Sequence, residues 1–220
     1  MTPINYICIA SISLLAMGCV KSSPPPHPFI PSAQLAISYQ NATDSLTKSR
    51  ATLLFNGGQS ATNCESYYDL ISQNRVEESI DNQLAKSEYL TCDALKILLH
   101  SSGVSSEYNV MSSMGETLLS NLDLRSFPSS LYRKSSDEFH SLKSLYPIFT
   151  SATENVAELN TENWAMTLEV VAISRINDNE YPDWIVWLTD ESKTGNYRGY
   201  STLIIYDPDQ YDSLKASIYP

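Results

Sequence analysis

The sequence predicts an α+β fold in which an N-terminal helical segment is followed by a C-terminal antiparallel β meander. Two patterns support this prediction. Between residues 33 and 150, apolar residues recur at helical spacing between residues that cap or stop helices. Between residues 151 and 220, three apolar segments are typical of strands, and short polar connections separate them. We expect both parts to form one domain over residues 33–220, because about 200 residues can build one substantial core.

The first part is expected to contain four or five helices. The first would cover residues 45–55, capped by Asp44 and stopped by the Asn-Gly-Gly sequence at 56–58. Two more are expected over residues 63–73 and 76–99.

The helix expected over 76–99 is amphipathic, with charged residues on the face opposite its apolar one. Gly103 follows it and would provide a stop. Four apolar residues would lie near the covered face: Ile80, Leu84, Ala94 and Leu98.

Two shorter helices are expected further along. Ser113 and Glu116 have the spacing of a capping box, which predicts a short helix through Leu122. Ser135 or the serine after it could cap another helix, which Pro147 would end.

Three strands are expected in the second part. Residues 164–172 alternate between apolar and polar types, which is typical of a strand with one covered face. Residues 183–190 are almost continuously apolar, which favours a central strand covered on both faces. Residues 198–206 alternate again. The connections at 176–182 and 191–197 are short and polar, so the strands should run antiparallel to their neighbours.

An apolar segment opens the chain and ends at a cysteine. Residues 4–15 are too few to cross a bilayer, which takes roughly 20 residues, and are typical of the hydrophobic part of a signal peptide. The sequence Leu-Ala-Met-Gly-Cys at residues 15–19 resembles the lipobox of bacterial lipoprotein precursors. The resemblance implies that residues 1–18 are a signal peptide and that Cys19 carries the lipid.

Prolines follow that cysteine. Residues 19–32 include Pro24, Pro25 and Pro26, which favour an extended tether over the alternative of a buried N-terminal helix with an ordinary core thiol at Cys19. Position 20 is not aspartate, and in lipoprotein sorting this implies the outer membrane, with the protein facing the periplasm.

The charge of the chain excludes one class of partner. Its formal net charge is −11, and its 14 basic residues are scattered rather than clustered. Nucleic-acid binding needs clustered lysine and arginine to displace counterions, so we expect no nucleic-acid partner. The same argument makes adsorption to anionic lipid unfavourable, which leaves the N-terminal lipid as the membrane contact.

Four cysteines are present, and the lipobox resemblance accounts for two of them. Cys8 would leave with the signal peptide and Cys19 would be lipidated. Cys64 and Cys92 then remain as a pair in a compartment that permits disulfides, so we expect a bond between them. Zinc binding is the competing interpretation, but the cysteine spacing does not match a zinc site.

Residues 175–185 resemble calcium-binding loops of the pattern D-x-[DN]-x-D-G-x-x-D followed by an apolar strand. Asn177 and Asp183 match ligand positions, and Asn179 stands where a third acidic ligand belongs. Arg175 replaces the first aspartate and Glu180 the glycine of the turn. We therefore predict a structural loop that binds calcium weakly or not at all, and we expect no metal or other cofactor.

Polar residues gather at the two ends of the meander. The central strand has eight residues at about 3.3 Å each, so a catalytic carboxylate pair could form only within one end. One end would collect Asn177, Asp178, Asn179, Glu180, Asp183, Asp207 and Asp209, and the other Glu162, Asp190, Glu191, Lys193 and Arg198. A serine triad has little support, because no serine lies in a G-x-S-x-G elbow and surface or capping roles suit His100 and His140.

These observations favour a non-catalytic, outer-membrane-anchored periplasmic lipoprotein that acts as a binding or envelope-structural module. A periplasmic protein or a cell-wall ligand would be its partner, bound through aromatic residues beside the sheet. Residues 183–198 are similar to the end of uncharacterised Gram-negative envelope lipoproteins, a resemblance that implies no activity. The alternative is a periplasmic hydrolase with a carboxylate pair.

Overall fold

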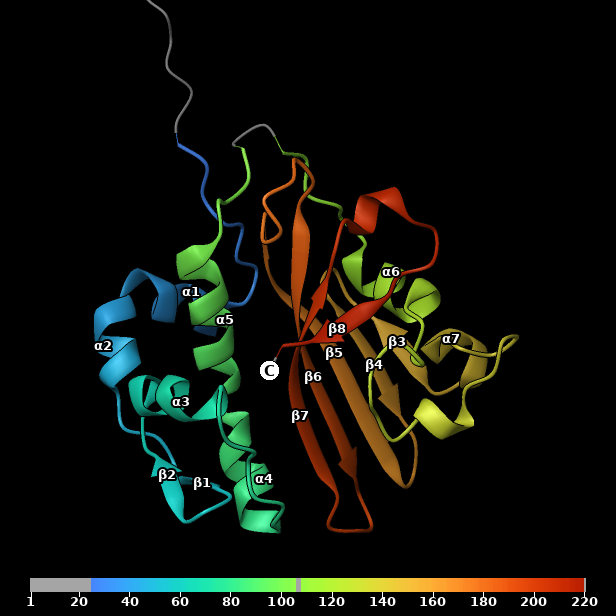
Figure 1. The fold of residues 1–220 in the computed structure, drawn as a ribbon. Coiled ribbons are helices and arrows are strands. Elements are labelled where there is room, and N and C mark those ends of the chain that lie inside the picture. Colours follow the sequence, from blue (N-terminus) through green and yellow to red (C-terminus); the bar gives the residue numbers. More distant parts are fainter. Residues whose placement is uncertain (1–24, 106–107, 220) are drawn as a thin grey trace, which may run out of the picture.

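The computed structural model describes residues 25–105 and 108–219, and it has the predicted α+β architecture. Its centre is a six-stranded antiparallel sheet with the strand order β3-β4-β5-β6-β7-β8. Helices cover both faces, so three layers result (Figure 1). The strands of this sheet are β3 (Thr150–Ala152), β4 (Val156–Asn160), β5 (Trp164–Ser174), β6 (Asp183–Ser192), β7 (Arg198–Ile205) and β8 (Ala216–Ile218).

One face of the sheet carries the N-terminal half of the chain. Helices α1, α4 and α5 lie against the sheet, and α2, α3 and a small hairpin pack outside them (Figure 1). These elements are α1 (Ala33–Gln40), α2 (Ala42–Thr47), β1 (Leu53–Phe55), β2 (Gln59–Ala61), α3 (Cys64–Ile71), α4 (Ile80–Ser87) and α5 (Leu90–His100).

The other face is covered by two helices and a long connection between them. Helix α6 contacts β3, β4 and β5, and α7 packs on α6. The elements here are α6 (Met114–Asn121), the 3-10 turns η1 (Tyr132–Lys134) and η2 (Pro208–Gln210), and α7 (Leu142–Leu145). The largest apolar core lies between these elements and the sheet.

The three predicted strands are confirmed as β5, β6 and β7, each antiparallel to its neighbour. The apolar run of β6 is covered on both faces: Trp184 and Val186 lie in the core under α6, whereas Ile185 lies under α5. In β5 the alternation is interrupted by a bulge between Val170 and Ala172. An inserted residue shifts the following side chains to the opposite face.

The prediction of a helix over residues 45–55 is wrong. Helix α2 ends at Thr47, and residues 53–55 form a strand instead. Gly57 and Gly58 have φ values of 93° and 80°, so they make the tight turn of a β hairpin rather than a helix stop. Leu53 and Phe55 are buried and Leu54 between them is exposed, which is the alternation of a strand. The prediction interpreted these apolar residues as part of a helical pattern.

The helix expected over 63–73 is confirmed as α3, whose N-terminal Asn63 and Ser66 form a capping box. The helix expected over 76–99 is two helices, because the chain turns at Tyr89. The Tyr89 side chain is fully buried, and its hydroxyl donates to the carbonyl oxygens of Ala51 and Ala61.

The buried face of α4 also differs from the expected one. Ile80 and Leu84 are 49% and 47% exposed, while Asn82 and Ala85 are buried. The Asn82 side chain accepts from the Leu54 N–H and donates to the Leu54 carbonyl, at 2.6 and 2.9 Å. This pair of bonds to β1 determines which side of α4 turns inward.

The later helices agree in part. Helix α6 is where it was expected, but the Ser113 side chain caps nothing, and Glu116 pairs with Lys143 instead. The helix expected from Ser135 or the next serine begins only at Leu142, where Ser141 provides the cap. Helix α1 has no counterpart among the predictions, since its sequence has weak amphipathicity.

The proline-rich segment contacts the body of the protein. The backbones of His27 and Val104 exchange two hydrogen bonds, and those of Phe29 and Ile173 exchange two more. The segment therefore extends the edge of β5 beyond the reach of the short β4. Cys8 and Cys19 lie outside the described residues. In the described part of the chain, no helix has the length and apolar character needed to span a membrane.

Candidate functional site

The predicted disulfide is present. Cys64, the first residue of α3, is bonded to Cys92 in α5, with their Cα atoms 5.2 Å apart. Both cysteines are fully buried in a small core shared with the β1–β2 hairpin. The bond thus ties the outer helix to the helix that contacts the sheet.

The calcium-like loop makes bonds with its own backbone. The Asn177 side-chain oxygen accepts from the Asn179 N–H, and the Asn179 side-chain oxygen accepts from the Tyr181 N–H. Asp183 is fully buried, and its two oxygens accept from the N–H groups of Ile176 and Asp207. Burial raises the pKa of Asp183, although these backbone bonds oppose the rise.

The weak calcium candidates Asn177, Asn179 and Asp183 therefore serve the turn. Asn179 also donates to Asp207, which joins the loop to the segment after β7. Across residues 25–105 and 108–219, no group of three or more histidine, cysteine, aspartate or glutamate residues could hold a metal ion.

The other end of the meander is organised by Asp190, which is 1% exposed. Its carboxylate accepts from both the N–H and the hydroxyl of Ser130 and from the indole of Trp164. The Tyr197 hydroxyl also donates to it, at 3.3 Å. Because Glu191 follows Asp190 in a strand, the two side chains point to opposite faces and cannot act as a pair.

The aromatic residues serve mainly packing. Trp184 is fully buried, and Trp187 packs on the core beneath α5. Trp164 stacks on Tyr197 with ring centroids 5.5 Å apart, beside Asp190.

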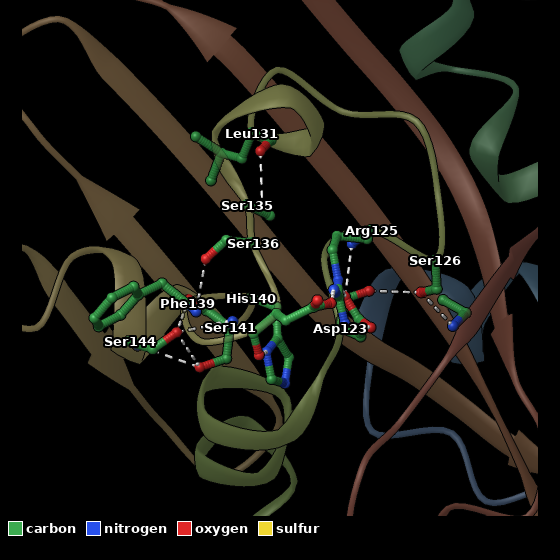
Figure 2. Close-up of polar contacts among 12 residues, drawn as sticks. Asp123, Arg125, Ser126, Leu131, Ser135, Ser136, Phe139, His140, Ser141 and Ser144 are labelled. Carbon is green, nitrogen blue, oxygen red and sulfur yellow. Dashed lines mark hydrogen bonds and ion pairs between the residues drawn. The ribbon is translucent and has the colours of Figure 1, made fainter.

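Figure 2 shows the polar contacts of the connection between α6 and β3, where His140 lies between the Ser141–Ser144 capping pair and Asp123. Arg125 pairs with Asp123 and lowers the pKa of that carboxyl. The His140 ring contacts the Asp137 carbonyl at 3.0 Å, and among the described residues no serine hydroxyl bonds to it.

His100 is similar, since its ring contacts the carbonyl of Lys96 one helical turn earlier. The described hydrogen bonds of both histidines therefore fit local backbone capping and provide no activated serine.

A buried polar group lies under α5. Asp93 is 3% exposed and accepts hydrogen bonds from the hydroxyls of Tyr67, at 2.9 Å, and Thr202, at 3.0 Å. Burial raises its pKa to about 7, against these two bonds and the charges of Lys86 and Lys96, which lower it. The Asp93 carboxyl therefore gains and loses its proton near neutral pH.

Next to this group lies a cleft of about 280 Å³ between α4 and β7. The α4 cleft, as we call it, is held together by the bond from the Arg198 N–H to the side-chain oxygen of Gln83, at 3.1 Å. Its lining residues are Val76, Glu77, Glu78, Gln83, Lys86, Tyr197, Arg198, Gly199, Tyr200 and Ser201.

Charges in the α4 cleft are of both signs. The Arg198 guanidinium lies 3.7 Å from the Glu191 carboxylate and donates to the carbonyl oxygens of Ser192 and Tyr197, so its charge is paired within the protein. The Tyr200 hydroxyl donates to the same Glu191. Lys86 has no ion-pair partner among the described residues, and burial lowers its pKa, opposed by the charge of Asp93.

Sequence reasoning identified Arg198 and Glu191 as members of one end of the meander but missed Gln83 and Lys86. Both lie within the helix expected over residues 76–99, but neither was singled out. Their role depends on a contact between residues 115 positions apart in the chain, and no local pattern signals such a contact.

No protein-family model matches the chain, and no similar curated protein or solved structure was found. The fold and the cleft therefore define the class of protein at the level of architecture: an α/β/α layered α+β protein with a polar cleft between one helix and the sheet edge.

Proposed function

We propose that the protein is a non-catalytic, lipid-anchored protein of the outer membrane that faces the periplasm and binds a cell-wall ligand in the α4 cleft. The lipobox resemblance at residues 15–19 supports the anchor at Cys19. The cleft, which has residues of both charges and two tyrosines, supports binding of a polar ligand.

The position of the cleft is the observation that carries the proposal. The proline-rich segment pairs with Ile173, opposite Trp184 at the start of β6, whereas the cleft lies beside Arg198, opposite Glu191 near its end. Seven residues of strand separate these points by roughly 23 Å. If a lipid is attached ahead of this segment, the cleft lies at the end of the protein that is distant from the anchor. It would then face the cell wall.

Binding is a better account than hydrolysis. Asp183 and Asp190, the buried carboxylates at the two ends of the meander, are each occupied by hydrogen-bond donors of the protein. A glycosidase needs two carboxyl groups roughly 5–9 Å apart on either side of the substrate. Neither residue lines the α4 cleft, and the two glutamates that do, Glu77 and Glu78, are consecutive residues of one segment ahead of α4 rather than residues on either side of the cleft.

Anchoring is tested by replacing Cys19 with alanine. We expect this variant to lose metabolic palmitate labelling and to move from the membrane fraction to the soluble periplasm. Unchanged labelling and fractionation would contradict the anchor.

Binding is tested by co-sedimentation of the mature protein with isolated cell-wall sacculi. Tyr200→Ala removes a ring from the cleft and should reduce the bound fraction by about tenfold, as loss of an aromatic contact in a binding site can do. The control is Tyr132→Ala, which removes a half-exposed ring on the other side of the sheet. Equal sedimentation of all three proteins would overturn the role of the cleft.

A further inference from the structure

We propose that Lys86 binds a carboxylate of a peptide ligand in the α4 cleft and that the ligand is a short zwitterionic peptide, such as the peptide stem of the cell wall. This inference rests on the proposed function and names its ligand class.

The first argument concerns Lys86 itself. It lies in the last turn of α4, is half-buried, and lines the cleft. Its neighbour Asp93 is buried behind it and already accepts bonds from Tyr67 and Thr202. A half-buried ammonium group with no ion-pair partner among the described residues is stabilised by an incoming anion.

The second argument concerns the rest of the cleft. Glu77 and Glu78 line it just ahead of α4. Carboxylates that can pair with a ligand amine and an ammonium that can pair with a ligand carboxylate therefore line the same cleft. A peptide with a free amine and a free carboxylate complements both signs of charge.

The third argument excludes other ligand classes. Phosphate-rich ligands would be repelled by Glu77, by Glu78 and by the net charge of −11. A peptide backbone, by contrast, has a partner in Gln83, whose side-chain oxygen accepts from Arg198 while its amide NH₂ has no acceptor among the described residues. That amide can donate to a ligand carbonyl or carboxylate.

The test is calorimetric titration of the full-length mature protein in detergent micelles. The probe is the tripeptide alanine–γ-glutamate–diaminopimelate with its three carboxylates free, and the comparison is the same tripeptide with all three amidated. We expect the amidated peptide to bind at least about tenfold more weakly, as the loss of a charge-assisted bond predicts. Equal binding of the two peptides, or binding of neither, would overturn the inference.

Variants locate the carboxylate. Lys86→Gln should weaken the binding of the free peptide by about tenfold and abolish the preference over the amidated one, whereas Lys86→Arg should keep the preference. Lys215→Gln is the matched control, because Lys215 is an exposed lysine just before β8 that does not line the cleft. Melting curves of Lys86→Gln verify that it is folded.

The inference and the proposed function fail in different ways. If sacculi bind wild-type protein and Lys86→Gln equally, the role of Lys86 is wrong and the binding of cell wall stands. If the tripeptide binds through Lys86 but sacculi do not sediment the protein, the role of Lys86 stands and the cell-wall assignment is wrong.

Discussion

At the residue scale, Asp93 is a buried carboxyl whose pKa is raised by its surroundings. It lies on α5 against β7, next to the disulfide-bonded Cys92. The hydroxyls of Tyr67 and Thr202 face it, and Lys86 and Lys96 are the nearby cations that act on its charge. These four groups offset only part of the free energy lost by removing a carboxylate from solvent, so its pKa in the folded protein is about 7.

The sign of the pH dependence follows. The folded-state pKa of Asp93 is raised above the value of 3.8 that applies to an unfolded chain. Its contribution to stability is therefore fully present below about pH 4 and is lost as the pH rises toward 7, at up to about 1.4 kcal/mol per pH unit. Asp93→Asn removes this titration.

We accordingly expect the free energy of unfolding of Asp93→Asn, relative to wild type, to increase between pH 4 and pH 7. Chemical denaturation at several pH values measures it. A difference that stays constant over this range would mean that Asp93 is ionised in the folded protein with an ordinary pKa. Asp209→Asn is a control, because Asp209 is exposed.

At the element scale, the disulfide joins α3 to α5. Its closed loop spans a sequence separation of 28 residues, for which the chain-entropy treatment gives a stabilisation of roughly 3–4 kcal/mol. The double variant Cys64→Ala/Cys92→Ala should melt roughly 6–16 °C lower than wild type. Calorimetry measures this shift. Non-reducing peptide mapping of the isolated protein should find the two cysteine peptides linked, and free thiols at both positions would contradict the account.

The loop between β5 and β6 gives a second prediction at this scale. Asp183 already accepts from the N–H groups of Ile176 and Asp207, so its oxygens are used within the loop. Millimolar calcium added to chelator-treated protein should leave the melting temperature within about one degree, since a weak ligand contributes little through RT ln(1 + [L]/Kd). A rise of several degrees that Asp183→Ala abolishes would reveal a calcium site.

The elements also show how far local patterns determine this fold. The three long strands β5, β6 and β7 were predicted because alternation and apolar runs report directly on which faces are covered, whereas the short strands β3, β4 and β8 were not predicted. The bulge at Val170 escaped prediction, since it leaves no local signature. The turn at Tyr89 was missed for the same reason, since tertiary contacts of the buried tyrosine decide where the helix breaks. The hairpin at residues 53–61 was missed because its strand alternation and its Gly57–Gly58 turn were interpreted as a helix and a helix stop.

The features of the candidate site likewise include some that the sequence predicted and some that it did not. The bonding of Cys64 to Cys92 followed from counting cysteines, and the bonded turn at Asp183 followed from its departures from a calcium loop. The α4 cleft joins Gln83 to Arg198 across 115 positions, so its composition became visible only in three dimensions.

At the scale of the whole molecule, the proline-rich segment and the α4 cleft occupy opposite ends of the central sheet. The central claim is that an anchored protein presents this cleft to the cell wall. Its most direct test is photo-crosslinking in living cells, with a photoreactive amino acid at position 78 in the cleft or at position 132 on the other side of the sheet. The account predicts that position 78 captures cell-wall peptide fragments, identified by mass after digestion, and that position 132 does not. Capture of no such fragment at position 78, or equal capture at both positions, would contradict it.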